Sequence, residues 1–314
     1  MSDTQPLSPD LAHFAAILRN GGVVAFPTET VYGLGADATN ADAVLGIYTT
    51  KGRPRFNPLI VHCADLDMAE RIAEFSPLAH RLARFWPGPL TMVLKLRPDA
   101  GIADIVTAGL GTVGIRIPAH PLARALIEAA GVPLAAPSAN PSGRLSPTSA
   151  AQVVAGFGGR VPVLDGGPCS AGVESTIIAI DGDAVVQLRA GALGREEIES
   201  VLERPVPRAS EDSPIAAPGM LASHYAPNAA MRLNAASPEP GEAYLAFGEE
   251  PETATGALRN LSVSGDLREA ARNLFAMLHA LDATGAQRIA VAPIPETGLG
   301  EAINDRLRRA AAPR

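Results

Sequence analysis

The chain has 314 residues, of which 47% are hydrophobic and 4% aromatic, so it can bury more than one core built mainly from aliphatic side chains. The formal net charge of −7 argues against the broad basic face with which proteins usually grip nucleic acid. No signal peptide or membrane-spanning run is seen, and the two cysteines, Cys63 and Cys169, match no metal or redox motif. We therefore expect a cytoplasmic protein with reduced thiols.

Predicted helices and strands alternate over the first 205 residues. Ser8 should cap a first helix with Pro9 in its first turn, and Asn40 should cap a helix over 40–50. Strands are predicted at 23–26, 59–62, 91–96, 113–117, 134–136, 161–164 and 175–180, and further helices at 65–75, 78–86, 121–130, 149–156 and 194–203. Because some strands follow one another without a helix between them, the pattern predicts an α/β domain with a mixed sheet.

The composition changes after residue 204. Prolines at 205, 207, 214, 218, 227, 238 and 240 predict a linker of stiff, extended segments over 206–240. Beyond it, strands at 243–247 and 288–292 and helices at 266–283 and 300–311 predict a small α/β domain over 241–314, with Asp266 as the cap of its first helix.

Two polar segments interrupt the predicted elements of the first half. PTETVYGLG (27–35) follows a buried strand and offers two hydroxyls, a carboxylate and glycine backbone at a strand end, where α/β proteins commonly bind ligands. KGRPRFNPL (51–59) carries Lys51, Arg53 and Arg55 around the helix breakers Gly52 and Pro54. Such a cationic loop suits a triphosphate. The alternatives are an ordinary capped turn and a solvated basic loop.

Two further segments indicate ligand binding more weakly. In APSANPSG (136–143), Ser138 and Asn140 follow an apolar strand, although such a turn can also bond only to itself. Arg116 in GIRIP lies inside an apolar strand, and Arg189 in LRAG ends another. Each buried arginine needs an anionic partner, which can be a carboxylate of the protein or a ligand.

Seven segments follow one another in the order PTETVYGLG, KGRPRFNPL, FWPGPLT, GIRIP, APSAN, GVEST and LRAG. Together, in this order, they resemble the YrdC-domain family over about residues 10–205. The segment PGMLASHYAP (218–227) and the second domain resemble the two-domain, long form of the threonylcarbamoyladenylate synthases. The resemblance implies a YrdC-like twisted mixed sheet flanked by helices, a linker that folds over the active site, and a Rossmann-like C-terminal domain.

The resemblance also implies the reaction. Such an enzyme is a nucleotidyltransferase that makes threonylcarbamoyl-AMP and pyrophosphate from L-threonine, bicarbonate and ATP, and the product serves the modification of tRNA next to the anticodon. The product would pass to a downstream tRNA threonylcarbamoyltransferase. Mg²⁺ would be held mainly by the ATP phosphates rather than by a protein site. Neither membrane association nor stable nucleic-acid binding is expected.

Site residues follow from the matching motif positions. Catalytic roles at the phosphates are implied for Lys51, Arg53, Ser138 and Asn140. ATP contacts are implied for Arg53, Asn57, Thr112, Ser138, Ser146, Arg189 and Tyr225. Threonine contacts are implied for Thr30, His62, Arg116, Ala136 and Ser175, with Arg116 at the carboxylate.

Two other functions compete with this interpretation. The basic loop at 51–55 also fits a module that binds double-stranded RNA or tRNA, although the acidic whole and the Gly and Pro within the loop weigh against it. A carbamoyltransferase that uses carbamoyl phosphate is the second alternative, because YrdC-like domains occur in such enzymes. The chain lacks the zinc-finger and acylphosphatase-like segments of one such group.

Overall fold

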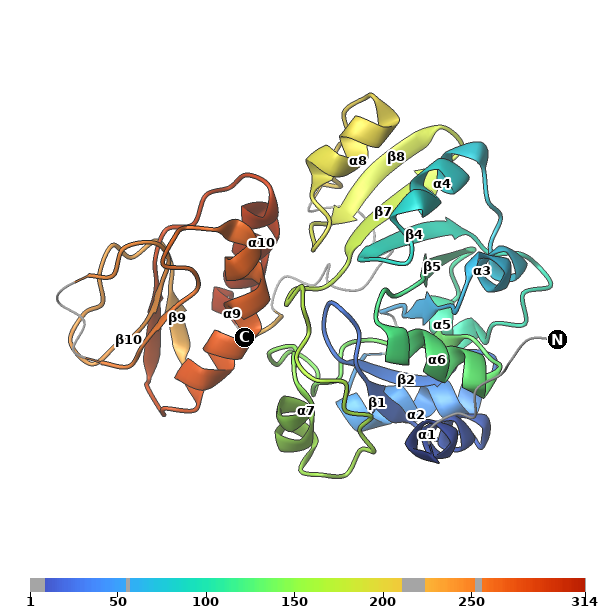
Figure 1. Cartoon of the computed structure of the whole chain (residues 1–314), viewed down its shortest axis with the longest axis horizontal. Coiled ribbons are helices and arrows are strands. Elements are labelled where there is room, and N and C mark those ends of the chain that lie inside the picture. Colours follow the sequence, from blue (N-terminus) through green and yellow to red (C-terminus); the bar gives the residue numbers. More distant parts are fainter. Residues whose placement is uncertain (1–8, 55–56, 211–223, 252–255, 314) are drawn as a thin grey trace.

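The computed structural model describes residues 9–54, 57–210, 224–251 and 256–313. They form a large domain and a smaller one, arranged along the long axis of the molecule (Figure 1). The predicted cap Ser8, the cation Arg55 and the stretch 211–223 of the predicted linker lie outside the described residues. The expected class, α/β with a mixed sheet and a second small α/β domain, is confirmed.

The large domain is built on an eight-stranded sheet with the order β1-β2-β6-β3-β5-β4-β7-β8. Its strands are β1 (Val24–Phe26), β2 (Gly33–Asp37), β3 (Ile60–His62), β4 (Leu90–Lys95), β5 (Thr112–Arg116), β6 (Leu134–Ala135), β7 (Thr176–Asp181) and β8 (Ala184–Arg189). The pairs β3–β5 and β4–β7 are parallel, and the other neighbours are antiparallel. The sheet is therefore mixed, as predicted.

Helices cover the sheet unevenly. The helices are α1 (Pro9–Arg19), α2 (Ala41–Lys51), α3 (Leu66–Ile72), α4 (Pro77–Leu82), the 3-10 turn η1 (Ala83–Phe85), α5 (Asp104–Thr107), α6 (Pro121–Ala130), α7 (Ala150–Phe157) and α8 (Arg195–Leu202). The main core lies between one face of the sheet and helices that include α2, α3 and α4, whereas α1 and α6 pack together on the other face. Beyond α1 and α6, that second face carries the small cluster of Ile60, Val93 and Ile177.

The alternation of β5 decides which side chains reach this second face. Val113 and Ile115 belong to the main core. Because successive side chains of a strand point to opposite faces, Gly114 and Arg116 lie on the other face. Local signals set the helix bounds as predicted: the Asn40 side chain accepts from two backbone N–H groups at the start of α2, and Gly52, with φ 62°, ends it.

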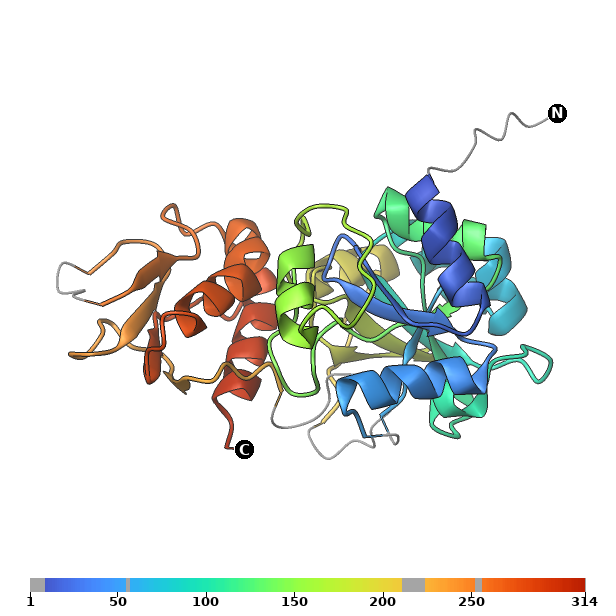
Figure 2. The same cartoon turned by 90° about the horizontal axis from the view of Figure 1, so that it is seen from below.

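The small domain has a four-stranded parallel sheet with the order β11-β10-β12-β9. Its elements are β9 (Ala230–Arg232), β10 (Ala243–Ala246), β11 (Leu258–Asn260), α9 (Leu267–Asp282), β12 (Arg288–Val291) and α10 (Leu299–Ala311). Both helices lie between this sheet and the large domain (Figures 1 and 2). Asp266 caps α9 by accepting from the N–H of Glu269, as predicted.

Several elements differ from the sequence prediction, which included neither α5 nor β11. Edge strand β9 lies inside the range predicted as linker, because three partly exposed residues give no apolar alternation. The range 161–164 forms no strand and contributes one bridge, between Val163 and Ala25. The glycine-rich β2 was not predicted. Its glycines make room for a buried ring, since a Cβ on Gly35 would lie 2.6 Å from Phe26 Cε1.

Candidate active site

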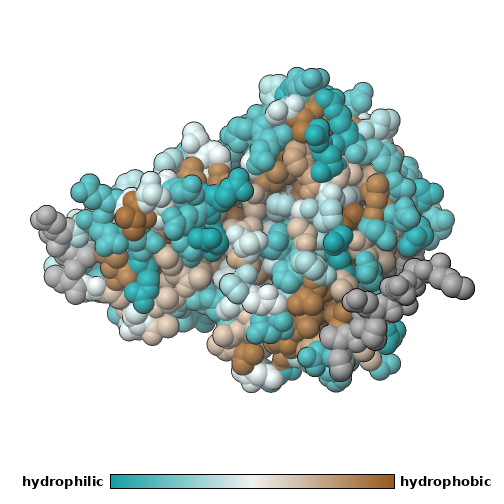
Figure 3. Space-filling model, viewed as in Figure 1, coloured by the Kyte–Doolittle hydropathy of each residue, from teal (hydrophilic) through white to brown (hydrophobic). Residues whose placement is uncertain are grey.

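Residues from six of the quoted segments, PTETVYGLG, KGRPRFNPL, GIRIP, APSAN, GVEST and LRAG, line one cavity although they lie far apart in the sequence. The space it encloses, with its opening to solvent, is about 540 Å³, which suits a small-molecule ligand. Pale, weakly polar residues lie in the region between the two domains in the space-filling view (Figure 3). The lining residues are Thr28, Thr30, Val31, Gly33, Arg53, Ile60, His62, Arg116, Ala136, Pro137, Ser138, Glu174, Ser175, Arg189, His224 and Tyr225.

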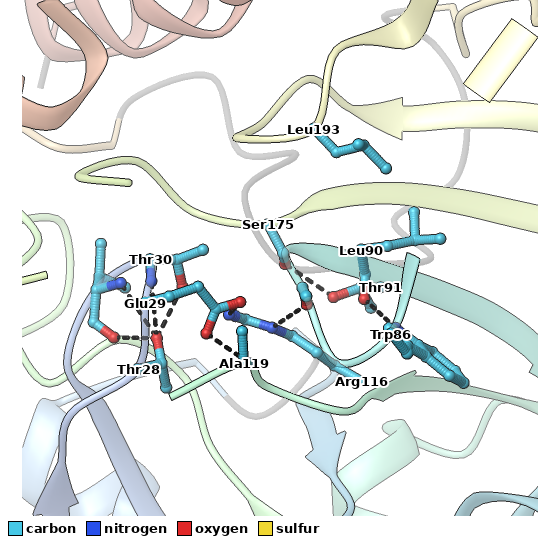
Figure 4. Close-up of polar contacts among 12 residues, drawn as sticks. Thr28, Glu29, Thr30, Trp86, Leu90, Thr91, Arg116, Ala119, Ser175 and Leu193 are labelled. Atoms are coloured by element: carbon cyan, nitrogen blue, oxygen red, sulfur yellow. Dashed lines mark hydrogen bonds and ion pairs between the residues drawn. The ribbon is translucent and has the colours of Figure 1, made fainter. Parts of the chain in front are cut away.

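Arg116, at the end of β5, forms a buried ion pair with Glu29. Its Nη2 lies 2.7 Å from Glu29 Oε1, and the two side chains are 5% and 11% exposed. The other oxygen of Glu29 accepts from the N–H of Ala119 at 3.0 Å (Figure 4). A protein carboxylate thus neutralises the charge of Arg116, while its guanidinium still lines the cavity.

The turn before β2 is fixed by its own hydroxyls. Thr28 Oγ1 lies 2.8 Å from Thr30 Oγ1 and donates to the carbonyl of Val31 at 2.6 Å (Figure 4). Both threonines are buried. The PTET segment therefore presents a rigid polar edge to the cavity next to the Arg116–Glu29 pair.

Lys51 fixes the Ser-Ala-Asn turn. It is the last residue of α2, rather than part of a loop, and its ammonium donates to the carbonyls of Ser138 and Asn140. The carbonyl of Lys51 in turn accepts from the N–H of Ser142 at 2.8 Å. Burial, and then the charge of Arg53, lowers the pKa of Lys51 well below its ordinary value.

Several buried polar atoms near the cavity lack a hydrogen-bond partner among the described residues. They are Arg53 Nε, Asn57 Oδ1, Asn140 Oδ1 and His224 Nδ1. Arg53 donates from Nη2 to the carbonyl of Pro58 at 3.3 Å, and burial lowers its pKa to about 10. Because buried polar atoms are normally paired, this group of atoms points to a polar ligand.

Arg189, at the end of β8, holds Ser175. Its Nε and Nη2 donate to the Ser175 carbonyl at 3.1 and 2.9 Å, and Nη2 also reaches the hydroxyl at 3.1 Å. That hydroxyl lies 2.8 Å from Thr91 Oγ1 (Figure 4). Burial lowers the pKa of Arg189, because the charged form is poorly solvated there.

The cavity is electropositive. Three guanidinium groups, those of Arg53, Arg116 and Arg189, line it, whereas Glu174 is the one carboxylate in its described lining. Burial lowers the pKa of both lining histidines, His62 and His224, to about 3. They are therefore neutral at pH 7, and the site as a whole favours an anionic ligand.

The predicted site residues fall into three groups. Nine line the cavity: Thr30, Arg53, His62, Arg116, Ala136, Ser138, Ser175, Arg189 and Tyr225. Four are buried in the structure without lining it: Lys51, Asn57, Asn140 and Ser146. Thr112 is exposed at the start of β5, at the other end of the strand from Arg116, so the structure does not bring it to this cavity.

Sequence reasoning missed three participants. Glu174 stands in the quoted GVEST segment but received no role, and the hydroxyl of Ser146 donates to it at 2.5 Å. His224 precedes Tyr225 in the predicted linker and lines the cavity. Arg306 of α10 pairs with Glu174 at 2.8 Å. Nothing in the sequence near Arg306 indicated this contact, because its partner is 132 positions away.

Neither a metal cluster nor a membrane helix is found in the described parts of the chain. No group of three or more His, Cys, Asp or Glu side chains is placed there to hold a metal ion. Within the same ranges, no helix is both long and apolar enough to cross a membrane.

Comparison with known proteins places the chain in a family. Residues 16–191 match the family described as telomere recombination (Sua5, YciO and YrdC), and residues 193–312 match the domain described as threonylcarbamoyl-AMP synthase, C-terminal domain. The chain is 42% identical to the threonylcarbamoyl-AMP synthase of Bacillus subtilis, over 98% of this chain and 94% of that protein.

A fungal and an archaeal protein are also similar to the chain over most of its length. The threonylcarbamoyl-AMP synthase of Schizosaccharomyces pombe is 38% identical over 96% of this chain and 88% of its own length. The crystal structure of Pyrococcus abyssi Sua5 complexed with L-threonine superposes with a TM-score of 0.87 at 39% identity, covering 96% of this chain and 94% of that one. The chain therefore belongs to the Sua5, YciO and YrdC family, in its form with a second, C-terminal domain.

Proposed function

We propose that this chain is a threonylcarbamoyl-AMP synthase, which converts L-threonine, bicarbonate and ATP to threonylcarbamoyl-AMP and pyrophosphate. The observation that carries the proposal is the cavity with three buried arginines and unpaired polar atoms, found in a chain similar over nearly its whole length to proteins of that name. The similar structure of Pyrococcus abyssi Sua5 is a complex with L-threonine.

Threonine would bind at the Arg116 end of the cavity. The guanidinium of Arg116 is oriented by Glu29 and by the Gly88 carbonyl, so it is preorganised for a carboxylate. His62 is neutral and buried beside it. A neutral imidazole places no positive charge beside the threonine amine, which must react as a nucleophile.

The chemistry needs no protein nucleophile. The amine of threonine takes up carbon dioxide from bicarbonate to form an N-carboxylate, with loss of water. A carboxylate oxygen then attacks the α-phosphorus of ATP, and the bond to pyrophosphate breaks. Two unit negative charges 4 Å apart repel by roughly 4 kcal/mol at an effective dielectric constant of 20. The charges of Arg53 and Arg189 would offset this repulsion.

Lys51 contributes by holding the turn that bears Ser138 and Asn140. Mg²⁺ would enter with ATP as part of the nucleotide substrate, held by phosphate oxygens and water. The protein's part is then to position two anions, with backbone and side-chain donors already in place.

The product is an activated carbamoyl donor, and a downstream tRNA threonylcarbamoyltransferase would consume it. The cytoplasm is the compartment we propose, because Cys63 and Cys169 are free, buried thiols, the usual form in a reducing compartment. The alternative of an RNA-binding module has less support, since the cations converge on a buried cavity rather than on an open basic face. The names of the relatives favour the synthase over a carbamoyltransferase.

The test is pyrophosphate release by the purified chain with ATP and Mg²⁺. We expect release to require both threonine and bicarbonate. Omission of each substrate in turn is the control. Release that is independent of threonine would indicate a simple ATPase, and release driven by carbamoyl phosphate would support the carbamoyltransferase instead.

A further inference from the structure

The small domain packs closely against the loop that carries Glu174. We call residues 172–176 the GVEST loop. Gly172 has φ +75°, and a Cβ on it would overlap the backbone of Ala271 and Arg272 in α9. Val173 is fully buried in the core of the small domain. The loop therefore lies directly on α9 (Figure 1), with no room for a side chain at Gly172.

Arg306 reaches from α10 into the wall of the cavity. Its side chain is 0% exposed. Its Nε donates to Glu174 Oε2 at 2.8 Å, and its Nη1 donates to the Ala190 carbonyl at 2.7 Å. The guanidinium carbon also lies 5.3 Å from the centre of the Tyr225 ring. One side chain of the small domain thus contacts two residues that line the cavity.

Glu174 depends on this contact. It is buried, and Ser146 Oγ donates to its other oxygen at 2.5 Å. Burial disfavours its charged form, but Arg306 and then Arg189 hold the pKa of Glu174 below its ordinary value. Without Arg306, the carboxylate would either draw Arg189 away from Ser175 or take up a proton, and both changes rearrange the wall.

We infer that Arg306 is a positioning residue of the nucleotide site. From the small domain it fixes Glu174, and through Glu174 it keeps Arg189 and Ser175 in place. This inference rests on the proposed function and gives the second domain a part in the site. The inference requires that the activity lost on substitution of Arg306 depend on the charge of Glu174. A purely structural role of Arg306, in holding the two domains together, would not depend on that charge.

The experiment is a double-mutant cycle in the full-length chain, read out as kcat/KM for ATP. Arg306→Met keeps the aliphatic stem and should lower kcat/KM about tenfold to a hundredfold, as small misplacements in a site do. Arg306→Lys keeps a charge beside Glu174 and should restore part of the loss. The matched control is Arg308→Met on the same helix, where the side chain is 54% exposed and pairs with Glu296 at the surface.

The second arm repeats Arg306→Met in the Glu174→Gln background. With no charge at position 174, the substitution should change kcat/KM by no more than about twofold, the usual spread of additivity. An equal loss in both backgrounds, in variants that melt as the parent does, would overturn the inference. If Arg306→Met alone fails to fold, Arg306→Lys compared in the two backgrounds decides the question in the same way.

Failure of the proposed function would be seen separately. If the unsubstituted chain releases no pyrophosphate, the synthase proposal fails, and the same cycle is read from the affinity for ATP by calorimetry. Coupling between Arg306 and Glu174 in that affinity still supports the inference. Absence of coupling there overturns it.

Discussion

Replacing Lys51 with methionine tests whether Lys51 serves mainly to position the turn that carries Ser138 or to stabilise the fold. Lys51 is 4% exposed, and its ammonium donates to the carbonyls of Ser138 and Asn140. Methionine keeps the aliphatic stem and removes all donors. The two carbonyls lose their partner, and the turn that carries Ser138 is no longer tied to the end of α2.

The magnitudes for folding and turnover differ. Two buried carbonyls without a donor cost about 2–6 kcal/mol in total, but removing a buried ammonium relieves a desolvation penalty of several kcal/mol. We therefore expect the free energy of unfolding to change by no more than about 3 kcal/mol. Turnover has no such compensation, because a displaced Ser138 and a lost positive charge should lower kcat/KM at least about a hundredfold.

The assay is pyrophosphate release by Lys51→Met beside a chemical-denaturation curve of the same sample. A folded variant with turnover near that of the parent would refute the assigned role of Lys51. A loss of turnover fully explained by unfolding at the assay temperature would refute the offset between the lost hydrogen bonds and the desolvation of the ammonium.

Three further predictions follow from the site and the core. Arg116→Met should raise the KM for threonine roughly a hundredfold, and an unchanged threonine dependence would contradict the carboxylate contact. Folded His62 has a pKa of about 3, against 6.5 as the ordinary value. The unfolded chain therefore binds this proton first, and the folded state loses stability as pH falls from about 6.5 to about 3. His62→Gln should flatten that decline by about 1.4 kcal/mol per pH unit, and denaturation at pH 6, 5 and 4 checks it: parallel curves for parent and variant would rule out the buried neutral imidazole. Gly35→Ala should destabilise the fold by about 1–3 kcal/mol, because its Cβ would meet the buried ring of Phe26. Gly111→Ala, which meets nothing within 4 Å, is the control and should melt as the parent does. Equal melting of both variants would argue against tight packing at Gly35.

Much of the fold could be predicted because its signals are local. The caps Asn40 and Asp266 mark the starts of α2 and α9, and Gly52 marks the end of α2. Short or glycine-rich strands carry no such pattern. Strand β2 pairs with two neighbours although it reads as a turn, because its glycines fit against Phe26.

Nine of the predicted site residues line the cavity, whereas the partners of these residues could not be predicted from the sequence. Arg116 needed an anion on sequence grounds, but the choice of Glu29 depends on a contact between residues 87 positions apart. Lys51 was expected in a loop, and it lies instead at a helix end with backbone carbonyls as partners. Long-range pairs of this kind are set by the packing of distant elements, which the pattern of one segment does not contain.

The central claim is that the cavity joins bicarbonate-derived carbon to threonine and then to AMP. The most direct measurement is the mass of the nucleotide product formed from ¹³C-bicarbonate, threonine and ATP. We predict threonylcarbamoyl-AMP that contains one ¹³C atom, formed in step with pyrophosphate. A product without the label, such as a simple adenylate of threonine, would contradict the account.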